Sequence, residues 1–257
     1  MREGDPEFRP CLVLPTFNNA GTLGGVLERA LALGLPTYVV NDGCTDGTGE
    51  VLAAFRGRER LRVLMHDANQ GKAAAMRTGF NAAIADGCTH AVTIDTDGQL
   101  DPEQSPLLLE AARRSPRALV LGVRDQRIER CPRRSRVGRW WANAFIYIEC
   151  GVRVTDSQCG LRVYPLEFVR RVPVKSGRFG YETEVITLAC WCGYGVVQVP
   201  VSCRYFEQRV THFRPWVDTW RAVALHARLL GSAIFARPGR IVDQEAAPAG
   251  TPVGMRE

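Results

Sequence analysis

The sequence predicts an α/β protein with a mostly parallel, Rossmann-like sheet and helices on both of its faces. Short apolar runs alternate with helical segments through the first half of the chain, and the loops between them are short. The chain has 257 residues and is 46% apolar, so it can bury one sizeable core. Polar side chains also gather directly after the predicted strands, at the edge where parallel sheets bind their ligands.

The first half of the chain contains all but one of the clearly predicted strands. These strands cover residues 11–14, 37–40, 61–64, 91–94 and 118–123. The predicted helices between them cover residues 23–33, 48–55, 73–85 and 103–113. Because a helix separates each strand from the next, the pattern favours a parallel sheet that is covered on both faces.

The second half departs from this alternation. Helices are predicted at residues 140–150 and 181–192, a strand at 196–201, and a loop that enters a short strand in "DSQCGLRVYP" (156–165). A last helix is predicted at 216–234, with an apolar face that we expect to pack on the domain, and membrane contact as the alternative. This face carries Trp216, Trp220, Val223, Ala227, Leu230 and Ile234.

The stretch "TIDTDGQL" (93–100) places Asp95, Asp97 and Gln99 at alternate positions after a predicted strand. Carboxylates this close repel each other unless a cation lies nearby. The spacing excludes an EF-hand, because Leu100 and Pro106 stand where its glycine and its closing glutamate belong. The motif therefore favours Mg²⁺ or Mn²⁺ held together with substrate phosphates, and a polar turn is the alternative.

Two further polar motifs follow predicted strands. In "NQGKAAA" (69–75), Lys72 begins a helix, so it is either a phosphate or ribose contact or a surface lysine. The motif is not a P-loop, because His66 replaces its first glycine and Ala73 follows Lys72. In "VVNDGCTDGT" (39–48), Asp42 is a candidate for a hydrogen bond to a base or sugar, and Asp46 for a helix cap.

Together with "LPTFNNAGTL" (14–23), these motifs resemble the family-2 glycosyltransferases of the GT-A fold, and most closely the dolichyl- and polyprenyl-phosphate mannose or glucose synthases. The resemblance covers about residues 11–214, and "DSQCGLRVYP" and "GYETEVI" (180–186) extend it into the second half. It implies one catalytic domain over 1–236, with a nucleotide-sugar half (10–123), an acceptor half (124–214) and a C-terminal helix (215–236). We predict disorder for residues 237–257, which are rich in Pro, Gly, Ala and charge.

The resemblance also implies roles for individual residues. The expected contacts to the donor are Pro15, Thr16, Asn18, Asp42, Lys72, Asp95, Thr96 and Asp97. The expected contacts to Mg²⁺ or Mn²⁺ are Asp95, Asp97 and Gln99. Asp156 and Arg162 stand at catalytic positions. The family usually has Glu where Asn19 stands and Asp where Asn41 stands, so the identity of the nucleotide base stays open.

The nature of the acceptor decides which groups the reaction needs. The resemblance implies inverting transfer of a hexose from a GDP- or UDP-sugar to a lipid-linked acceptor, in first place a polyprenyl phosphate. Such a phosphate is already anionic and needs cations to position it. The candidates, besides Arg162, are Arg204, Arg209, His212 and Arg214. A hydroxyl acceptor would instead need a general base, and Asp156 is the first candidate. Glu182 and Glu184 are the next candidates, and their alternative role is to form salt bridges on a helix.

Positive charge is concentrated in one segment. The net charge is +6, and residues 124–139 hold seven arginines against Asp125 and Glu129, or 7 − 2 = +5. This segment is either a device for an anionic partner, such as a membrane surface next to Trp140 and Trp141, or a solvated loop. Nucleic-acid binding would explain the charge but not the aspartate motifs, so we expect no nucleic acid partner. A sugar-1-phosphate nucleotidyltransferase is excluded because "LPTFNNAG" lacks basic residues.

Cysteine usage and hydropathy indicate a cytoplasmic protein. The nine cysteines are scattered and lack zinc spacing, so we expect reduced and mostly buried thiols. No signal peptide opens the chain, and no apolar run reaches membrane-spanning length. We therefore expect a cytoplasmic location with peripheral contact to the inner face of the membrane.

Overall fold

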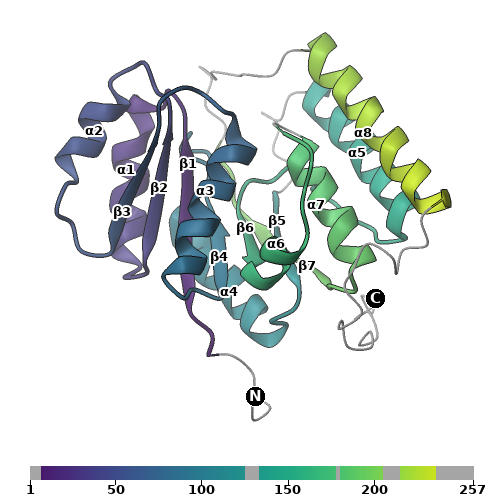
Figure 1. Cartoon of the computed structure of the whole chain (residues 1–257), viewed down its shortest axis with the longest axis horizontal. Helices are drawn as coiled ribbons and strands as arrows, with labels where there is room; N and C mark the ends of the chain where they lie inside the picture. Colours follow the sequence, from purple (N-terminus) through teal and green to yellow (C-terminus); the bar gives the residue numbers. More distant parts are fainter. Residues whose placement is uncertain (1–6, 125–132, 178–179, 205–214, 236–257) are drawn as a thin grey trace.

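The computed structural model describes residues 7–124, 133–177, 180–204 and 215–235, and its centre is a seven-stranded sheet with the order β3-β2-β1-β4-β6-β5-β7 (Figure 1). The strands are β1 (Pro10–Thr16), β2 (Thr37–Asp42), β3 (Leu61–His66), β4 (His90–Thr93), β5 (Leu119–Arg124), β6 (Arg162–Pro165) and β7 (Val196–Val201). Only β6 runs against its neighbours, β4 and β5, and the other described pairs are parallel. The predicted mostly parallel sheet is confirmed.

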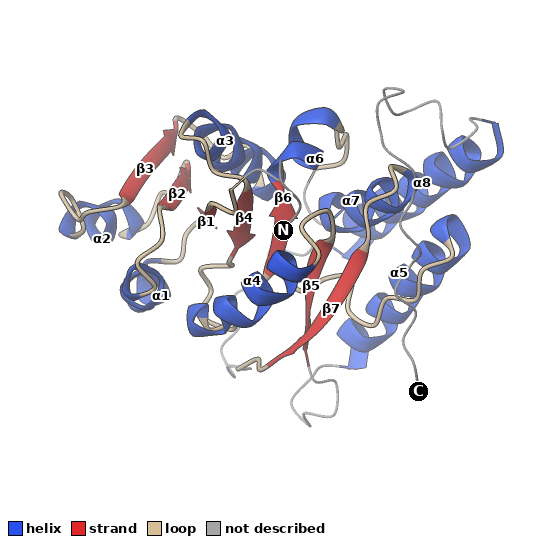
Figure 2. Ribbon diagram, turned by 90° about the horizontal axis from the view of Figure 1, so that it is seen from below, coloured by secondary structure: helices blue, strands red, loops and turns tan. Residues whose placement is uncertain are grey.

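Helices cover both faces of the sheet (Figure 2). One face carries α1 (Ala20–Ala32), α2 (Thr48–Ala54), the short 3-10 helix η1 (Pro102–Gln104) and α4 (Ser105–Arg114). The opposite face carries α3 (Lys72–Ala85), α6 (Leu166–Arg171) and α7 (Gly180–Trp191), and α5 (Arg133–Cys150) and α8 (Pro215–Phe235) pack beyond α7. Helix α6 and the first two turns of α5 were not predicted from the sequence.

Alternation along the strands divides the apolar residues between two cores. In β1, Cys11 and Val13 face the core under α3, while Leu12 and Leu14 face the core under α1. Gly79 of α3 lets that helix approach the sheet closely, because a Cβ atom there would lie 2.5 Å from Cγ1 of Val13. The fully apolar strands that this two-sided burial requires explain why the first half was predictable from the sequence.

Helix α8 packs on the domain, as expected, but through the face opposite to the predicted one. Leu225, His226 and Leu229 are buried, whereas Trp220 and Val223 of the predicted packing face are 69% and 51% exposed. The side chains of Trp216 and Ile234 lie outside the described residues. The predicted direction was therefore wrong, and a buried polar pair explains the difference.

That polar pair joins α8 to α5. His226 Nδ1 lies 2.7 Å from Oε1 of Glu149, and Thr187 of α7 donates a hydrogen bond to Oε2 of Glu149 at 2.9 Å. The His226 ring also stacks on Phe145 at a centroid distance of 4.4 Å. His226 and Glu149 make the packing faces of α8 and α5 less apolar in sequence. Hydropathy alone therefore predicts the wrong packing face for α8.

Two general expectations can be compared with the described residues. The eight cysteines among them are free thiols, four buried and four partly buried. Among the helices that are described, none has the length and apolarity needed to cross a bilayer.

Candidate active site

The loops after β1 and β4 meet where the sheet changes its winding direction, the usual ligand edge of such sheets. Thr96 joins them: its hydroxyl donates to the carbonyl of Pro15 at 3.3 Å and accepts from Asn19 Nδ2 at 3.0 Å. Its carbonyl accepts from the Thr22 hydroxyl at 2.6 Å. We expected Thr96 to contact a donor, but its side chain is buried and already paired. It fixes the position of the loop that carries Asp95 and Asp97.

Asn18 joins the loop after β1 to the loop after β2. Its Oδ1 accepts from the backbone N–H of Thr45 at 2.9 Å, and its own N–H donates to Sγ of Cys44 at 3.2 Å. The residue lies in the left-handed region at φ 53°, which asparagine tolerates better than most residues. Thr16, at the end of β1, is buried, and its hydroxyl has no hydrogen-bond partner in the described part of the chain. The predicted donor residues of strand one therefore lie together at this edge.

Asp42 holds the loop that leads to Lys72. Its carboxylate accepts from the N–H groups of Gln70 at 2.9 Å and Gly71 at 2.8 Å, and Oδ1 lies 2.7 Å from Nδ1 of His66. The second nitrogen of His66 is fixed by Thr78 at 2.9 Å. Asp42 is only 2% exposed, so the structure gives it a loop-fixing role beside the expected sugar or base contact.

Lys72 lies between two carboxylates from distant parts of the chain. Its Nζ is 2.6 Å from Oδ1 of Asp95 and 2.7 Å from Oε1 of Glu182, at the start of α7. Burial lowers the pKa of Lys72, but the charges of Asp95 and Glu182 outweigh this effect and hold it above its ordinary value. Oε2 of Glu182 is buried and makes no hydrogen bond within the described residues. The ammonium group of Lys72 thus balances the charge of Asp95, and the sequence did not predict this pair.

Gly160 makes room for this cluster. A Cβ atom at Gly160 would lie 2.0 Å from Oδ2 and 2.4 Å from Cγ of Asp95, so no larger residue fits without moving the carboxylate. The glycine belongs to "DSQCGLRVYP", which links that motif in space to "TIDTDGQL". Apart from the glycine itself, no pattern in the sequence predicts this contact.

Gln99 contacts Asp97 directly. Its backbone N–H donates to Oδ1 of Asp97 at 3.0 Å, and its Nε2 donates to Oδ2 at 2.8 Å. Gln99 thus orients Asp97, whereas we had expected it as a third metal ligand. Among the residues described, no group of three or more His, Cys, Asp or Glu side chains could hold a metal ion alone. Asp95 and Asp97 offer hard carboxylate oxygens at a partly exposed turn, so they fit a hard divalent ion that takes its other ligands from a bound phosphate.

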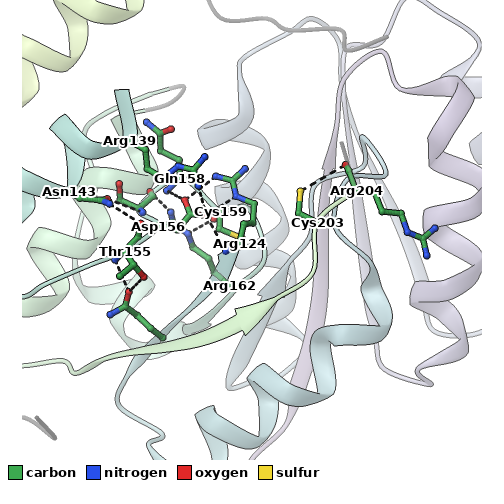
Figure 3. Close-up of polar contacts among 12 residues, drawn as sticks. Arg124, Arg139, Asn143, Thr155, Asp156, Gln158, Cys159, Arg162, Cys203 and Arg204 are labelled. Carbon is green, nitrogen blue, oxygen red and sulfur yellow. Dashed lines mark hydrogen bonds and ion pairs between the residues drawn. The ribbon is translucent and has the colours of Figure 1, made fainter. Parts of the chain in front are cut away.

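Asp156 is a fully buried carboxylate held by two arginines (Figure 3). Arg124, at the end of β5, binds it in a two-pronged manner, with Nε to Oδ2 at 2.7 Å and Nη2 to Oδ1 at 2.9 Å. Arg139 of α5 reaches Oδ2 at 3.4 Å. Burial raises the pKa of Asp156, but the hydrogen bonds and charge of Arg124 and the charge of Arg139 outweigh it and lower the pKa. Asp156 is therefore an ionised anchor.

This anchor changes the interpretation of the arginine-rich segment 124–139. Arg124 and Arg139, its first and last residues, are buried on Asp156, and residues from Arg133 onward belong to α5. Neither alternative expected for this segment, a device for an anionic partner or a solvated loop, holds for Arg124 and Arg139. Residues 125–132 lie outside the described part of the chain.

Arg162 has no exposed surface. Its three guanidinium nitrogens donate to the carbonyls of Cys159 at 2.7 Å, Glu182 at 2.8 Å and Ser157 at 2.6 Å. The expected catalytic contact with the acceptor does not fit this arrangement. Arg162 instead fixes the loop that carries Asp156 and Gly160 against the start of α7, where Glu182 lies.

The two glutamates of α7 differ in their surroundings. Glu182 pairs with Lys72 at the site, whereas Glu184 accepts from the N–H of Ser176 at 2.6 Å and pairs with Arg228 of α8 at 2.8 Å. The expectation that one of them forms ordinary salt bridges is met by Glu184.

Four acceptor cations were predicted between residues 203 and 215, and Arg204 is the one among them that the structure describes. Its backbone N–H donates to the carbonyl of Gln99 at 2.8 Å, and the neighbouring Cys203 pairs with Leu100 in a β-bridge. Its side chain is 69% exposed and lies 3.6 Å from Asp101. Arg204 thus lies beside the aspartate loop. Arg209, His212 and Arg214 fall outside the described residues.

The comparisons with known proteins agree with this geometry. The model of the family described as Glycosyl transferase family 2 matches residues 11–174. The chain is 29% identical over 206 residues to an undecaprenyl-phosphate mannosyltransferase of Micrococcus luteus, covering 76% of this chain and 83% of that protein. It is 27% identical to the polyprenol monophosphomannose synthase of Mycolicibacterium smegmatis, covering 77% and 78%.

A solved structure shares the fold. Glucosyl-3-phosphoglycerate synthase from Mycobacterium tuberculosis, solved with Mn²⁺, UDP-glucose and phosphoglyceric acid, matches with a TM-score of 0.64 and 20% identity. The match covers 88% of this chain and 80% of that chain. The predicted α/β, GT-A fold class is confirmed.

Proposed function

The chain belongs to glycosyl transferase family 2, and from this premise we propose that it transfers a hexose, with inversion, from a GDP- or UDP-sugar to a polyprenyl phosphate. Two relatives named for polyprenyl-phosphate acceptors support the acceptor class. The observation that carries the proposal is the cluster of Asp95, Lys72 and Glu182 at the carboxyl edge of the sheet. On this proposal, the one cation and two carboxylates of the cluster lie next to the diphosphate group of the donor, at the ligand edge of the sheet.

On this proposal, the donor residues divide into those that touch the donor and those that shape its pocket. Asn18, Lys72, Asp95 and Asp97 are partly exposed and offer polar groups to the nucleotide and its diphosphate. The residues that shape the pocket through the loops they hold are Pro15, Thr16, Asp42, Thr96 and Gln99. Among them, Asp42, Thr96 and Gln99 have buried, hydrogen-bonded polar side chains, and such groups make a pocket rigid before its ligand arrives.

Asp95 and Asp97 are the residues that would hold Mg²⁺ or Mn²⁺. A divalent ion bound there would neutralise the charge that develops on the leaving nucleoside diphosphate. Gln99 keeps the Asp97 carboxylate oriented, and Gly160 leaves space for Asp95. Lys72 can turn its ammonium group toward a phosphate oxygen while Glu182 continues to hold it.

The surroundings of Asp156 favour a phosphate acceptor over a hydroxyl acceptor. A hydroxyl nucleophile needs a general base whose pKa lies near the operating pH. Asp156 is fully buried, its oxygens are occupied by Arg124 and Arg139, and its pKa is lowered, so it is poorly suited to remove a proton. A polyprenyl phosphate is already ionised near neutral pH and needs no such base. Its phosphate would be positioned by Arg204 and by Arg209, His212 and Arg214.

A polyprenyl phosphate is a membrane lipid, so the proposal includes peripheral contact with the inner face of a membrane from the cytoplasm. The Arg204 side chain, which is exposed beside the aspartate loop, is consistent with an approach of the lipid headgroup from that side.

Replacing Asp97 tests the proposal. Asp97→Ala should abolish transfer from a GDP- or UDP-hexose to a polyprenyl phosphate in the presence of Mn²⁺, with a drop of about a hundredfold or more, because it removes one carboxylate of the ion site. Thermal unfolding should change little. The matched control is Glu110→Ala, which removes an exposed carboxylate that pairs with Arg114 within α4. Full activity of Asp97→Ala would overturn the assignment.

A further inference from the structure

We propose that Cys88 is an oxidation site for hydroperoxides, and that Cys11 converts the oxidised sulfur to an intramolecular disulfide that locks the amino ends of β1 and β4 together. Both residues are free thiols in the structure. Cys11 is the second residue of β1, and Cys88 lies two residues before β4. The pair lies at the edge of the sheet opposite to the candidate active site, and the inference does not depend on the proposed function.

The local backbone holds Cys88 against the first strand. Gly87 follows α3 in the left-handed region at φ 78°, and the N–H of Cys88 donates to the carbonyl of Ala83 at 2.9 Å. This arrangement is common at the carboxyl ends of helices. The next residue, Thr89, donates its N–H to the carbonyl of Arg9 at 2.8 Å. Cys88 is therefore fixed beside the start of β1.

The two thiols are already in contact at the core under α3. Cys11 has no exposed surface and belongs to that core, whereas Cys88 packs against it and is partly exposed. The hydrogen bond between the two sulfurs raises the pKa of Cys11 and lowers the pKa of Cys88. An accessible sulfur beside a second thiol is the arrangement typical of redox-sensitive cysteines.

The surroundings of Cys88 favour its thiolate form. The hydrogen bond with Cys11 lowers its pKa most. The Tyr38 hydroxyl, 3.8 Å from Sγ, and the charge of Arg9 lower it further, whereas burial and the charge of Asp86 raise it. The result is a pKa of about 7, so a large share of this thiol is ionised at neutral pH. The thiolate is the form of cysteine that acts as a nucleophile.

A second pair of thiols differs from this one at its exposed sulfur. Cys150, at the end of α5, and Cys190 of α7 also hydrogen-bond each other, and this bond lowers the pKa of Cys150. The Cys150 thiol, however, donates its proton to the carbonyl of Ile146 at 3.1 Å, and a carbonyl acceptor favours the protonated sulfur. We therefore expect Cys88 to react before Cys150.

The oxidation takes place in two balanced steps. The Cys88 thiolate attacks one oxygen of the hydroperoxide, so that an S–O bond forms and the O–O bond breaks. The second oxygen leaves and takes up the proton that the thiol had released. The sulfur of Cys11 then attacks the sulfur of Cys88, an S–S bond forms, and the hydroxyl leaves as water with the proton of Cys11. The two sulfurs lose two electrons, and the hydroperoxide gains them.

The disulfide should stabilise the fold without covering the candidate active site. Cys11 and Cys88 are far apart in sequence, and a bond between such residues strongly restricts the unfolded chain. Since the two thiols are already in contact, the folded protein needs little rearrangement to form the bond. The candidate donor residues follow the carboxyl ends of the same two strands, so the bond does not obstruct them.

Peptide mapping of the full chain tests the proposal. The reduced protein is treated with a slight excess of hydrogen peroxide at neutral pH, digested without reductant and analysed by mass spectrometry. Wild type should yield a peptide in which Cys11 and Cys88 are linked, and Cys88→Ser should not. Cys11→Ala should instead keep a sulfenic acid on Cys88, which dimedone traps. The matched control is Cys44→Ser, which removes another partly exposed thiol and should form the link as wild type does.

Thermal unfolding gives a second readout. Oxidised wild type should unfold about 5 °C or more above the reduced protein, and a reducing dithiol should reverse this shift. Cys88→Ser should show no such shift. The same measurement on the reduced variants shows whether they fold, and Cys11→Ser replaces Cys11→Ala if the latter does not. The alkylation rate of Cys88 with iodoacetamide should rise as the pH passes through about 7.

Three results would overturn the proposal. They are the absence of the linked peptide from oxidised wild type, the formation of a link between Cys150 and Cys190 in its place, and equal alkylation rates of Cys88 and Cys44 at neutral pH. A linked peptide without a shift in the unfolding temperature would overturn the locking effect of the disulfide.

Discussion

Lys72 pairs with two carboxylates, so it keeps one partner when the other turns away. Lys72 is 2.6 Å from Asp95 and 2.7 Å from Glu182, and these partners come from the loop after β4 and from α7. If Asp95 turns to a bound ion, Glu182 still fixes the ammonium group near its place. Glu182 is therefore a positioning residue that acts through Lys72, and its effect should differ from that of its neighbour on the helix, Glu184.

We expect Glu182→Gln to lower kcat about tenfold or more with little change in thermal stability, because the amide keeps a hydrogen bond but loses the charge that orients Lys72. Removing that charge should also lower the pKa of Lys72 toward its ordinary value. Lys72 should then react faster with an amine-acylating reagent, as measured by mass spectrometry. Lys175 is the chain's only other lysine and serves as the internal reference.

Glu184→Gln is the matched control. It weakens the pair with Arg228 and should lower the free energy of unfolding by about 1–3 kcal/mol while transfer per folded molecule is retained. Unchanged reactivity of Lys72 in Glu182→Gln would show that Glu182 does not control the lysine.

Among the secondary-structure elements, helix α8 is held on α5 by a polar pair that lies within an otherwise apolar interface. Glu149 and His226 lie between α5 and α8, and Thr187 of α7 completes the hydrogen bonding of the carboxylate. Such a pair fixes which face of a helix packs, because any rotation of α8 would leave the buried carboxylate of Glu149 without its partner.

His226→Ala should therefore lower the free energy of unfolding by about 3 kcal/mol, since it leaves Glu149 buried without its main partner. Urea denaturation would measure this loss, and hydrogen exchange should show faster opening of α8 than of the β-sheet. Val223→Ala, a change at a 51% exposed position of the same helix, should leave both nearly unchanged. A loss no larger in His226→Ala than in Val223→Ala would argue against the anchoring role.

The same elements show what the sequence can and cannot predict. Strand–helix alternation identified the parallel half, because strands buried on both faces are apolar throughout. The antiparallel β6 was found only as a short strand, since its direction depends on long-range pairing. The face of α8 was predicted wrongly because both sides carry apolar residues and the deciding contact, His226 with Glu149, is polar. At the site, motifs indicated Lys72 and Asp95, but only the structure shows that they pair.

For the molecule as a whole, the ionisation of Asp156 makes the stability of the fold depend on pH. Its pKa lies below the ordinary carboxyl value of 3.8 because Arg124 and Arg139 favour the charged form over the cost of burial. Because its pKa is lowered in the folded state, the carboxyl group adds stability at any pH above that ordinary pKa. This stability is lost as the pH falls through the folded-state value.

Asp156→Asn should thus be less stable than the wild type at neutral pH, by about 3 kcal/mol, because it leaves two arginines buried without their anion. The difference should begin to shrink below about pH 4, where this carboxyl takes up a proton in the unfolded chain, and should be lost as the pH falls through the lower folded-state pKa. Urea midpoints at neutral and acid pH measure both quantities. A difference that stays constant across this range would contradict the charged state assigned to Asp156.

The Asp156 anchor also bears on how the protein can diversify. Arg124 and Arg139 hold the two ends of the intervening chain on one carboxylate, so those ends keep a fixed separation whatever lies between them. The entropy of closing such a segment rises only slowly with its length, so insertions there cost little stability. We therefore expect residues 125–132 to be interchangeable between relatives as a cassette, with the frame and the donor pocket left in place.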